Sequence, residues 1–144
     1  MAIDDLDFDR TWFDRELEAG TFHVKRDMIL DYAKAIEDET VLEAHSKNEP
    51  LTAPPLFCSI LTGRDRLPDL KLRWGKRQFH AGQGYTSFGP VREGDTLKAT
   101  SRLLDVYEKT GRSGRMVFTV FELTYTNQHG EKVAAIRQSM VRQQ

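Results

Sequence analysis

Three side chains that could exchange protons, Asp38, Glu43 and His45, stand close together in a polar stretch of the chain. Acid–base catalysis needs two groups that titrate near the working pH, and burial can tune a carboxyl group such as Glu43 for that work. Simple solvation in a polar loop explains the same residues, because Asp38 ends a helical pattern and nothing apolar surrounds the other two. From residue types and spacing alone, both interpretations stay open.

Other reactive residue types have simpler structural explanations. The single cysteine, Cys58, lies in an apolar run and is typical of a small buried hydrophobic residue, with no base nearby for a Cys/His pair. The four histidines are too widely spaced, and too far from clustered acids, to predict a metal site. The Gly-Gln-Gly sequence at 82–84 lacks the following helix of a phosphate-binding loop and predicts a bulge or bend. Asp95, Arg112 and Arg115 fit turns.

The first elements expected along the chain are a leader, a strand and a helix. Residues 1–20 form an acidic leader with a flexible, disordered start, and Trp12 and Phe13 anchor it to the rest of the protein. A short strand over 21–25 follows. The spacing then predicts an amphipathic helix over 27–36, with these apolar residues on one face: Ile29, Tyr32, Ala33 and Ile36.

The next stretch changes from polar to apolar. Residues 37–52 lose the helical periodicity and predict a loop, so every candidate for proton transfer lies in that loop. Residues 56–61 form an apolar run, and Pro54 or Pro55 can occupy a first helical turn because amides there lack intrahelical partners. We therefore expect a buried helix at 56–61.

Four later segments are rich in β-branched and aromatic residues, which predicts strands. They are 78–88, 96–107, 116–126 and 133–141. The connectors at 89–94, 109–114 and 127–130 are short enough to make successive strands antiparallel neighbours. Both faces of segment 116–126 are apolar, which places it centrally in the sheet with cover on both sides. With the early strand, we expect an α+β fold in which a curved, five-stranded antiparallel sheet wraps around the apolar helix.

Composition indicates one globular domain over residues 1–144. The chain is 39% hydrophobic and 30% charged, and its net charge of -1 gives no reason to expect nucleic-acid binding. A single cysteine excludes an internal disulfide, and the acidic N-terminus is unlike a signal peptide. No apolar run is long enough to span a bilayer. We expect a cytoplasmic protein that needs no metal and no cofactor and does not bind membranes.

Five short stretches of sequence occur in the order and spacing of a known family. They are YAKAIED at 32–38, APPLF at 53–57, HAGQ at 80–83, VREGDTL at 91–97 and TGRSG at 110–114. Through them the chain resembles the MaoC-like hotdog-fold dehydratases and hydratases, and within these the subgroup similar to the dehydratase region of type I fatty acid synthases, an N-terminal MaoC-like domain. The resemblance covers most of residues 20–142 and implies a hotdog fold that dimerises into a double hotdog.

The resemblance also implies a reaction, the reversible addition of water to a 2-enoyl thioester at the interface between two hotdogs. In active relatives, the Asp and His of a pattern resembling Gly-Asp-x-Asn-Pro-x-His hold the water and move its protons. Here the Asp is Asp38, and Glu43 stands in the place of the His. The Gly, Asn and Pro are replaced by Glu37, Thr40 and Val41. Catalysis would therefore use Asp38 with Glu43 or with His45.

The residues that the resemblance implies for substrate binding lie in two of the matching stretches. Pro55, Leu56 and Phe57 open the apolar helix, where backbone amides could stabilise an enolate-like charge. His80, Gly82 and Gln83 would line the thioester cleft. For His80 and Gln83 a purely structural role is the open alternative.

These features lead to three hypotheses of function. The first is an (R)-specific 2-enoyl-thioester hydratase or 3-hydroxyacyl-thioester dehydratase component that acts on coenzyme A or acyl-carrier-protein thioesters. The second is a non-catalytic acyl-binding and stabilising subunit of a heteromeric hotdog dehydratase. The resemblance suggests this hypothesis, because some members of the family pair a degraded subunit with an active one. The third is a hotdog thioesterase, which the fold permits. The expected protein partner is another hotdog subunit, in a homodimer or a heterodimer.

Overall fold

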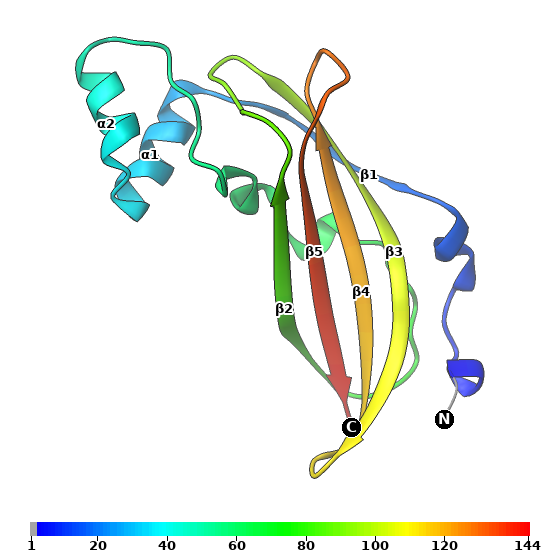
Figure 1. Ribbon diagram of the computed structural model, residues 1–144. Helices are drawn as coiled ribbons and strands as arrows, with labels where there is room; N and C mark the ends of the chain where they lie inside the picture. The colour runs from blue at the N-terminus through cyan, green and yellow to red at the C-terminus, as the bar shows by residue number, and fades with distance from the viewer. Residues whose placement is uncertain (1–2) are drawn as a thin grey trace.

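A computed structural model describes residues 3–144 of the chain. Within these residues one five-stranded antiparallel sheet curves along the molecule, with a pair of helices beside one end (Figure 1). The strands are β1 (Leu17–His23), β2 (Arg77–Ser87), β3 (Thr96–Gly111), β4 (Gly114–Thr126) and β5 (Lys132–Gln143). The α-helices are α1 (Arg26–Ile36) and α2 (Glu39–Ser46). The 3₁₀ helices are η1 (Ile3–Asp5), η2 (Arg10–Asp14), η3 (Phe57–Leu61) and η4 (Arg64–Arg66). The α+β class and all five predicted strands are confirmed.

The strand order across the sheet is β1-β3-β4-β5-β2, so β4 lies at the centre as predicted. The prediction that the connector at 89–94 joins two neighbouring strands is wrong, because β2 pairs with β5 at the far edge from β1. The connector is short but is not a hairpin turn. Its backbone instead bonds to segments outside the sheet: Glu93 N donates to Leu51 O at 2.9 Å and Gly94 N to Val24 O at 2.8 Å. These two bonds hold the connector in place as it crosses the end of the sheet from β2 to β3.

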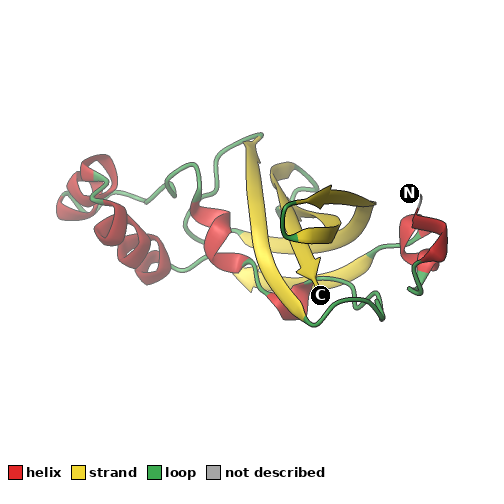
Figure 2. Ribbon diagram, turned by 90° about the horizontal axis from the view of Figure 1, so that it is seen from below, coloured by secondary structure: helices red, strands yellow, loops and turns green. Residues whose placement is uncertain are grey.

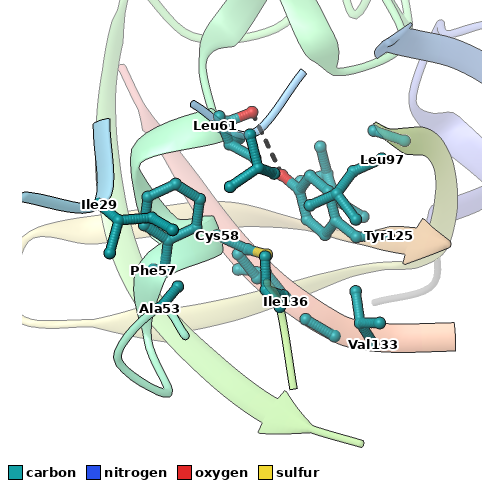
Figure 3. Packing of buried hydrophobic residues seen from close by; sticks show 14 of the residues in the cluster. Ile29, Ala53, Phe57, Cys58, Leu61, Leu97, Tyr125, Val133 and Ile136 are labelled. Carbon is teal, nitrogen blue, oxygen red and sulfur yellow. Dashed lines mark hydrogen bonds between the residues drawn. The ribbon is translucent and has the colours of Figure 1, made fainter. Parts of the chain in front are cut away.

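One face of the sheet, here called the inner face, carries most of the buried core. On β4 this face presents Val117, Leu123 and Tyr125, all fully buried. Near the helices it packs against α1 and η3, as Figure 3 shows for Ile29, Phe57 and Leu61. Phe118 and Val120 on the opposite, outer face are only partly buried. The cover predicted for both sides of β4 is therefore found on the inner side.

The segment that packs against the sheet is shorter than the helix predicted at 56–61. It forms the 3₁₀ helix η3, in which Phe57 N donates to Pro54 O at 3.0 Å and Ser59 N donates to Leu56 O at 3.0 Å. Leu56 is 52% exposed, although Phe57 is completely buried. With two prolines before it and five residues in all, η3 is held by its apolar contacts with the sheet more than by its own hydrogen bonds.

The N-terminal leader covers the other half of the inner face. Leu6 and Phe8 are buried there against Leu70 and Leu72. Trp12 anchors the leader as predicted, because its Nε1 donates to the carbonyl of Asp69 at 3.2 Å. The disorder expected at the start of the leader concerns residues 1–2, which lie outside the described residues. Figure 2 shows the leader and the α1–α2 pair at opposite ends of the molecule.

The prediction of a loop over residues 37–52 is wrong for its first half, which forms α2. The helix α1 ends at Glu37, whose φ of 58° is left-handed, and Asp38 then begins the next helix. Only Val41 of α2 is buried, so the segment shows no apolar stripe in the sequence. This explains why its periodicity did not indicate a helix.

Candidate functional site

The helix α2 carries the three candidates for proton transfer but holds them apart. Asp38 is its N-cap, and the Asp38 Oδ1 accepts a hydrogen bond from Val41 N at 3.2 Å. Since an α-helix rises 1.5 Å and turns 100° per residue, Asp38 and His45 are separated by roughly 10 Å along the axis. By the same geometry Asp38 and Glu43 point about 140° apart around it. The hydrogen bonds and ion pairs of the three groups lead to different partners, and none joins Asp38 to Glu43 or to His45 in the described chain.

Glu43 and His45 each have partners at the surface. Glu43 is exposed and forms an ion pair with Lys47, one turn on, at 3.0 Å. His45 is also exposed, and its Nδ1 accepts a hydrogen bond from Arg26 Nη2 at 3.2 Å. Neither group has the buried, apolar environment that would tune it for catalysis.

Arg26 connects His45 to a carboxylate that the sequence did not single out. Its Nη1 donates to Glu93 Oε2 at 2.8 Å and to the carbonyl of Glu49 at 2.9 Å. The backbone amide of Leu51 also donates to Glu93 at 3.0 Å, and this bond, followed by Arg26, lowers the pKa of Glu93. The cluster joins the start of α1 to the chain that leaves α2, which is a structural role.

An apolar hollow lies beside the Ala-Pro-Pro turn on the inner side of β2, here called the inner hollow. Its volume is about 240 Å³. Its walls come from three segments, 52–55 before η3, 89–91 after β2 and the end of β2 itself, together with Val133. Pro55 is exposed and lines this hollow, whereas Leu56 points to the surface and Phe57 into the core. Of the three binding residues predicted around η3, only Pro55 faces the inner hollow.

Backbone amides at the start of η3 are already engaged. The amide of Phe57 donates to Pro54 O, as described above, and the amide of Cys58 donates to Tyr85 Oη at 3.2 Å. Of the residues predicted to supply an oxyanion-binding amide, Pro55 has no N–H and the amide of Phe57 is engaged by Pro54 O. Tyr85 also lines the inner hollow, and sequence reasoning missed it because its contact with Cys58 depends on long-range packing.

The buried groups behind the hollow are all held neutral. Burial raises the pKa of Cys58 to about 11, and burial likewise raises the pKa values of Tyr85 and Tyr125. Tyr125 Oη donates to the carbonyl of Leu61 at 3.2 Å, the contact drawn as a dashed line in Figure 3. None of these groups is a base near neutral pH.

A β-bulge brings two other predicted residues to the same face. The register between β2 and β5 shifts between His80 and Gly82, so His80 lies opposite Met140 and Gln83 opposite Gln138. Without the bulge, residues 80 and 83 would point to opposite faces, because strand side chains alternate. His80 and Gln83 thus both lie on the inner side of β2, the edge strand that also carries Tyr85. The bulge or bend predicted at residues 82–84 lies just before that stretch, between His80 and Gly82, and residues 82–84 themselves pair in regular register.

The arrangement therefore separates the predicted residues into two groups. His80 and Gln83 lie on the inner side of the strand whose end lines the inner hollow, and both are exposed at the sheet edge. Gly82 stands between them, and a Cβ placed there would meet no atom within 4 Å. Figure 1 shows α2 as the element farthest from the sheet at that end. The groups suited to bind a thioester and the groups suited to move protons do not converge.

Two further predictions concern turns and metal sites. Asp95 holds its turn as predicted, since Oδ2 accepts from Arg92 N at 2.9 Å and Oδ1 from Gln128 Nε2 at 2.9 Å. Arg115, beside the hairpin tip, pairs with Glu108 and Asp5. Across residues 3–144, no three His, Cys, Asp or Glu side chains converge as metal ligands would.

The sequence matches a family model described as "FAS1-like, dehydratase domain region" over residues 11–136. The chain belongs to this family. The FAS1-like dehydratase region is the family predicted from the five sequence stretches, and the match spans both the inner hollow and α2. A search of curated proteins finds no relative of this sequence.

Solved structures share the hotdog fold of this FAS1-like dehydratase region. One is the C-terminally truncated HadBC (3R-hydroxyacyl-ACP dehydratase) complex from Mycobacterium tuberculosis, with 22% identity, a TM-score of 0.66 and coverage of 88% of this chain and 94% of that one. Another is a MaoC-like dehydratase from Rhodospirillum rubrum, with 18% identity, a TM-score of 0.64 and coverage of 90% and 92%. A third is the ChsH1–ChsH2 complex from Mycobacterium tuberculosis, with 17% identity, a TM-score of 0.63 and coverage of 89% and 82%.

The helices of the described chain are too short or too polar to cross a lipid bilayer.

Proposed function

We propose that the chain is the acyl-thioester-binding subunit of a hotdog dehydratase, and that a second hotdog subunit supplies the catalytic acid and base. The observation that carries this proposal is the helix α2. It engages the Asp38 carboxylate as a cap and holds Glu43 and His45 away from it. General acid–base catalysis on one thioester needs two groups that act on the same water. Here Asp38, Glu43 and His45 are each engaged by a different partner, which favours a binding role over a catalytic one.

The inner hollow supports the binding part of the proposal. Its lining is mostly apolar, from Ala53, Pro54 and Val133, with hydroxyl groups from Tyr85 and Ser87. Sites for small molecules commonly combine an apolar surface with a few polar groups that fix orientation. An acyl chain and its thioester carbonyl present this combination of surface and polar atoms. The adjacent His80 and Gln83 offer further hydrogen-bonding groups on the same side of β2.

Strand β2 offers the edge at which the second subunit would join. It is an edge strand of eleven residues, and all of these residues are exposed except Gly82 and Tyr85, which are partly buried. An uncovered edge of this length presents free backbone groups for pairing with another strand. The exposed apolar side chain of Phe79 on β2 adds surface for the partner to bury. The similar HadBC and ChsH1–ChsH2 structures are complexes, which supports a heterotypic partner.

The proposal is tested with crotonyl-coenzyme A and the purified chain alone. We expect saturable binding in a calorimetric titration, and no hydration above the rate in buffer when the loss of enoyl absorbance is followed. Hydration that disappears in Asp38→Asn would overturn the proposal in favour of the hydratase hypothesis, with Asp38 and Glu43 or His45 as its acid and base. Failure to bind the thioester would overturn it as well.

Substitutions of Asp38 separate its structural role from a catalytic one. Asp38→Ala removes the N-cap oxygen and should lower the free energy of unfolding by about 1 kcal/mol, whereas Asp38→Asn keeps a cap oxygen and should change it by only a few tenths. Both variants should bind crotonyl-coenzyme A as the native chain does. Urea denaturation followed by circular dichroism measures the first effect and calorimetry the second. Equal loss of stability in both variants would contradict the capping role.

A further inference from the structure

A second hollow lies on the outer face of the sheet, on the other side of the same part of β2. Its volume is about 400 Å³, and we call it the outer hollow. Gly84 and Ala135 form its floor, and a Cβ placed on Gly84 would meet only Arg137 Cβ at 4.0 Å. Small residues on two neighbouring strands thus leave a shallow depression between the longer side chains of Phe88, Lys132 and Arg137.

The walls of the outer hollow combine an exposed aromatic ring with two cations. Phe88 is 53% exposed, and Lys132 Nζ lies 5.0 Å from the centre of its ring. Arg137 is also exposed, with a side chain that is 66% accessible. An aromatic face stacks on any nucleobase, and guanidinium and ammonium groups bind phosphate. The hollow therefore suits a nucleotide, with its base at the ring and its phosphates at the cations.

The one carboxylate in the outer hollow does not cancel this charge. Glu122 lies 3.3 Å from Arg137 and 3.8 Å from Arg102, which approaches it from the next strand. Its negative charge is shared between two arginines, and Lys132 stands apart from both ion pairs. The lining of the outer hollow thus carries two positive charges, on Lys132 and Arg137, and one negative charge, on Glu122. The outer hollow thus favours an anionic ligand.

The outer hollow also connects with the inner one around the end of β2. Tyr85 lines both hollows, and Gly89 and Pro90, just beyond the last residue of the strand, line the inner one. A Cβ placed on Gly89 would meet no atom within 4 Å, so the chain is open at this point. A ligand could pass over Gly89 without displacing a partner strand paired along β2.

We propose that the outer hollow binds the nucleotide head of coenzyme A, while the pantetheine arm crosses Gly89 and carries the thioester into the inner hollow. This inference rests on the proposed function, which assigns the thioester to the inner hollow. It selects coenzyme A over an acyl carrier protein, because a carrier protein has a phosphate but no base for Phe88. Phe88, Lys132 and Arg137 then determine the choice of carrier and take no part in the chemistry.

The test is calorimetric titration of the purified chain with coenzyme A and with adenosine 3′,5′-bisphosphate. Phe88→Ala, Lys132→Gln and Arg137→Gln should each weaken the binding of both ligands about tenfold, the loss expected for one stacking or charge-assisted contact. The matched control is Arg102→Gln. It removes a cation of the same sheet face and the other partner of Glu122, but it does not line the hollow, so both ligands should bind unchanged.

Crotonyl-pantetheine, which has the thioester but no nucleotide, separates this inference from the proposed function. We expect it to bind more weakly than crotonyl-coenzyme A and to be unaffected by the three substitutions. If both thioesters bind equally well, the inference is overturned and the proposed function stands; if neither binds, both fail. If 5′-ADP binds as well as the bisphosphate and crotonyl-coenzyme A does not displace it, the hollow is an unrelated nucleotide site and the inference is wrong.

Discussion

Replacing Phe57 by alanine should lower the free energy of unfolding by about 3–5 kcal/mol, the usual cost of emptying a buried aromatic site. Phe57 is completely buried, and its ring packs edge-on against Tyr32 at a centroid distance of 5.9 Å. Figure 3 shows it between η3 and α1, beside Ile29. Because η3 has no side-chain cap, the loss of Phe57 removes the main contact that holds it on the sheet. Urea denaturation followed by circular dichroism measures the change.

The neighbouring residue Leu56 provides the matched control. It is 52% exposed, so Leu56→Ala should change the free energy of unfolding by less than about 0.5 kcal/mol. The two substitutions remove apolar side chains one residue apart from the same short helix. Similar losses in both variants would mean that η3 does not turn its Phe57 side toward the core as described.

Raising the pH above 9 should destabilise the protein because its buried thiol resists ionisation. The ordinary pKa of the group is 9.0, and burial raises the pKa of Cys58 to about 11. The folded state therefore holds the proton more tightly than the unfolded state. The stabilisation is complete below pH 9 and is lost as the pH rises toward 11, and it amounts to about 3 kcal/mol. Ionisation of Tyr85 and Tyr125, whose pKa values burial also raises, adds to the loss above pH 10.

Denaturation curves measured from pH 7 to 11 test this pH dependence. Cys58→Ala should be less stable than the native chain at pH 7, since it leaves a small cavity, but its stability should fall less steeply between pH 9 and 11. Cys58 also helps to raise the pKa values of Tyr85 and Tyr125, so the substitution removes part of the tyrosine contribution as well. A native chain and a Cys58→Ala variant with the same slope over this range would show that the thiol is not the group responsible.

Local sequence patterns predicted the strands and α1 but not the position of β2 in the sheet. Apolar spacing in α1 and β-branched composition in β3, β4 and β5 are properties of one segment at a time, and each was confirmed. The position of β2 depends on which partners the connector at 89–94 finds, and its bonds to Val24 and Leu51 are made between segments far apart in sequence. Loop length alone could not reveal them.

The two parts of the candidate site, the strand β2 and the helix α2, could be predicted from the sequence to different degrees. The Gly-Gln-Gly stretch indicated a bulge at 82–84, and a bulge is present two residues earlier, between His80 and Gly82, where it brings His80 and Gln83 to one face. The local signal for α2 was weak, because an Asp cap followed by a polar helix resembles a solvated loop. Tyr85 could not be singled out, since its hydroxyl meets Cys58 only after β2 pairs with β5 and η3 packs against the sheet.

The order of strands in the sheet also bears on how the chain folds. The strands β3, β4 and β5 follow one another through tight turns, so their pairing closes only short loops. Both edge strands join from far along the chain: Phe22 of β1 pairs with Leu97, and Arg77 of β2 pairs with Gln143. Long loops cost more entropy to close and slow the formation of such contacts. We expect the three-stranded meander to form first and the edge strands to dock onto it afterwards, so that a partner subunit meets the last part of the sheet to assemble.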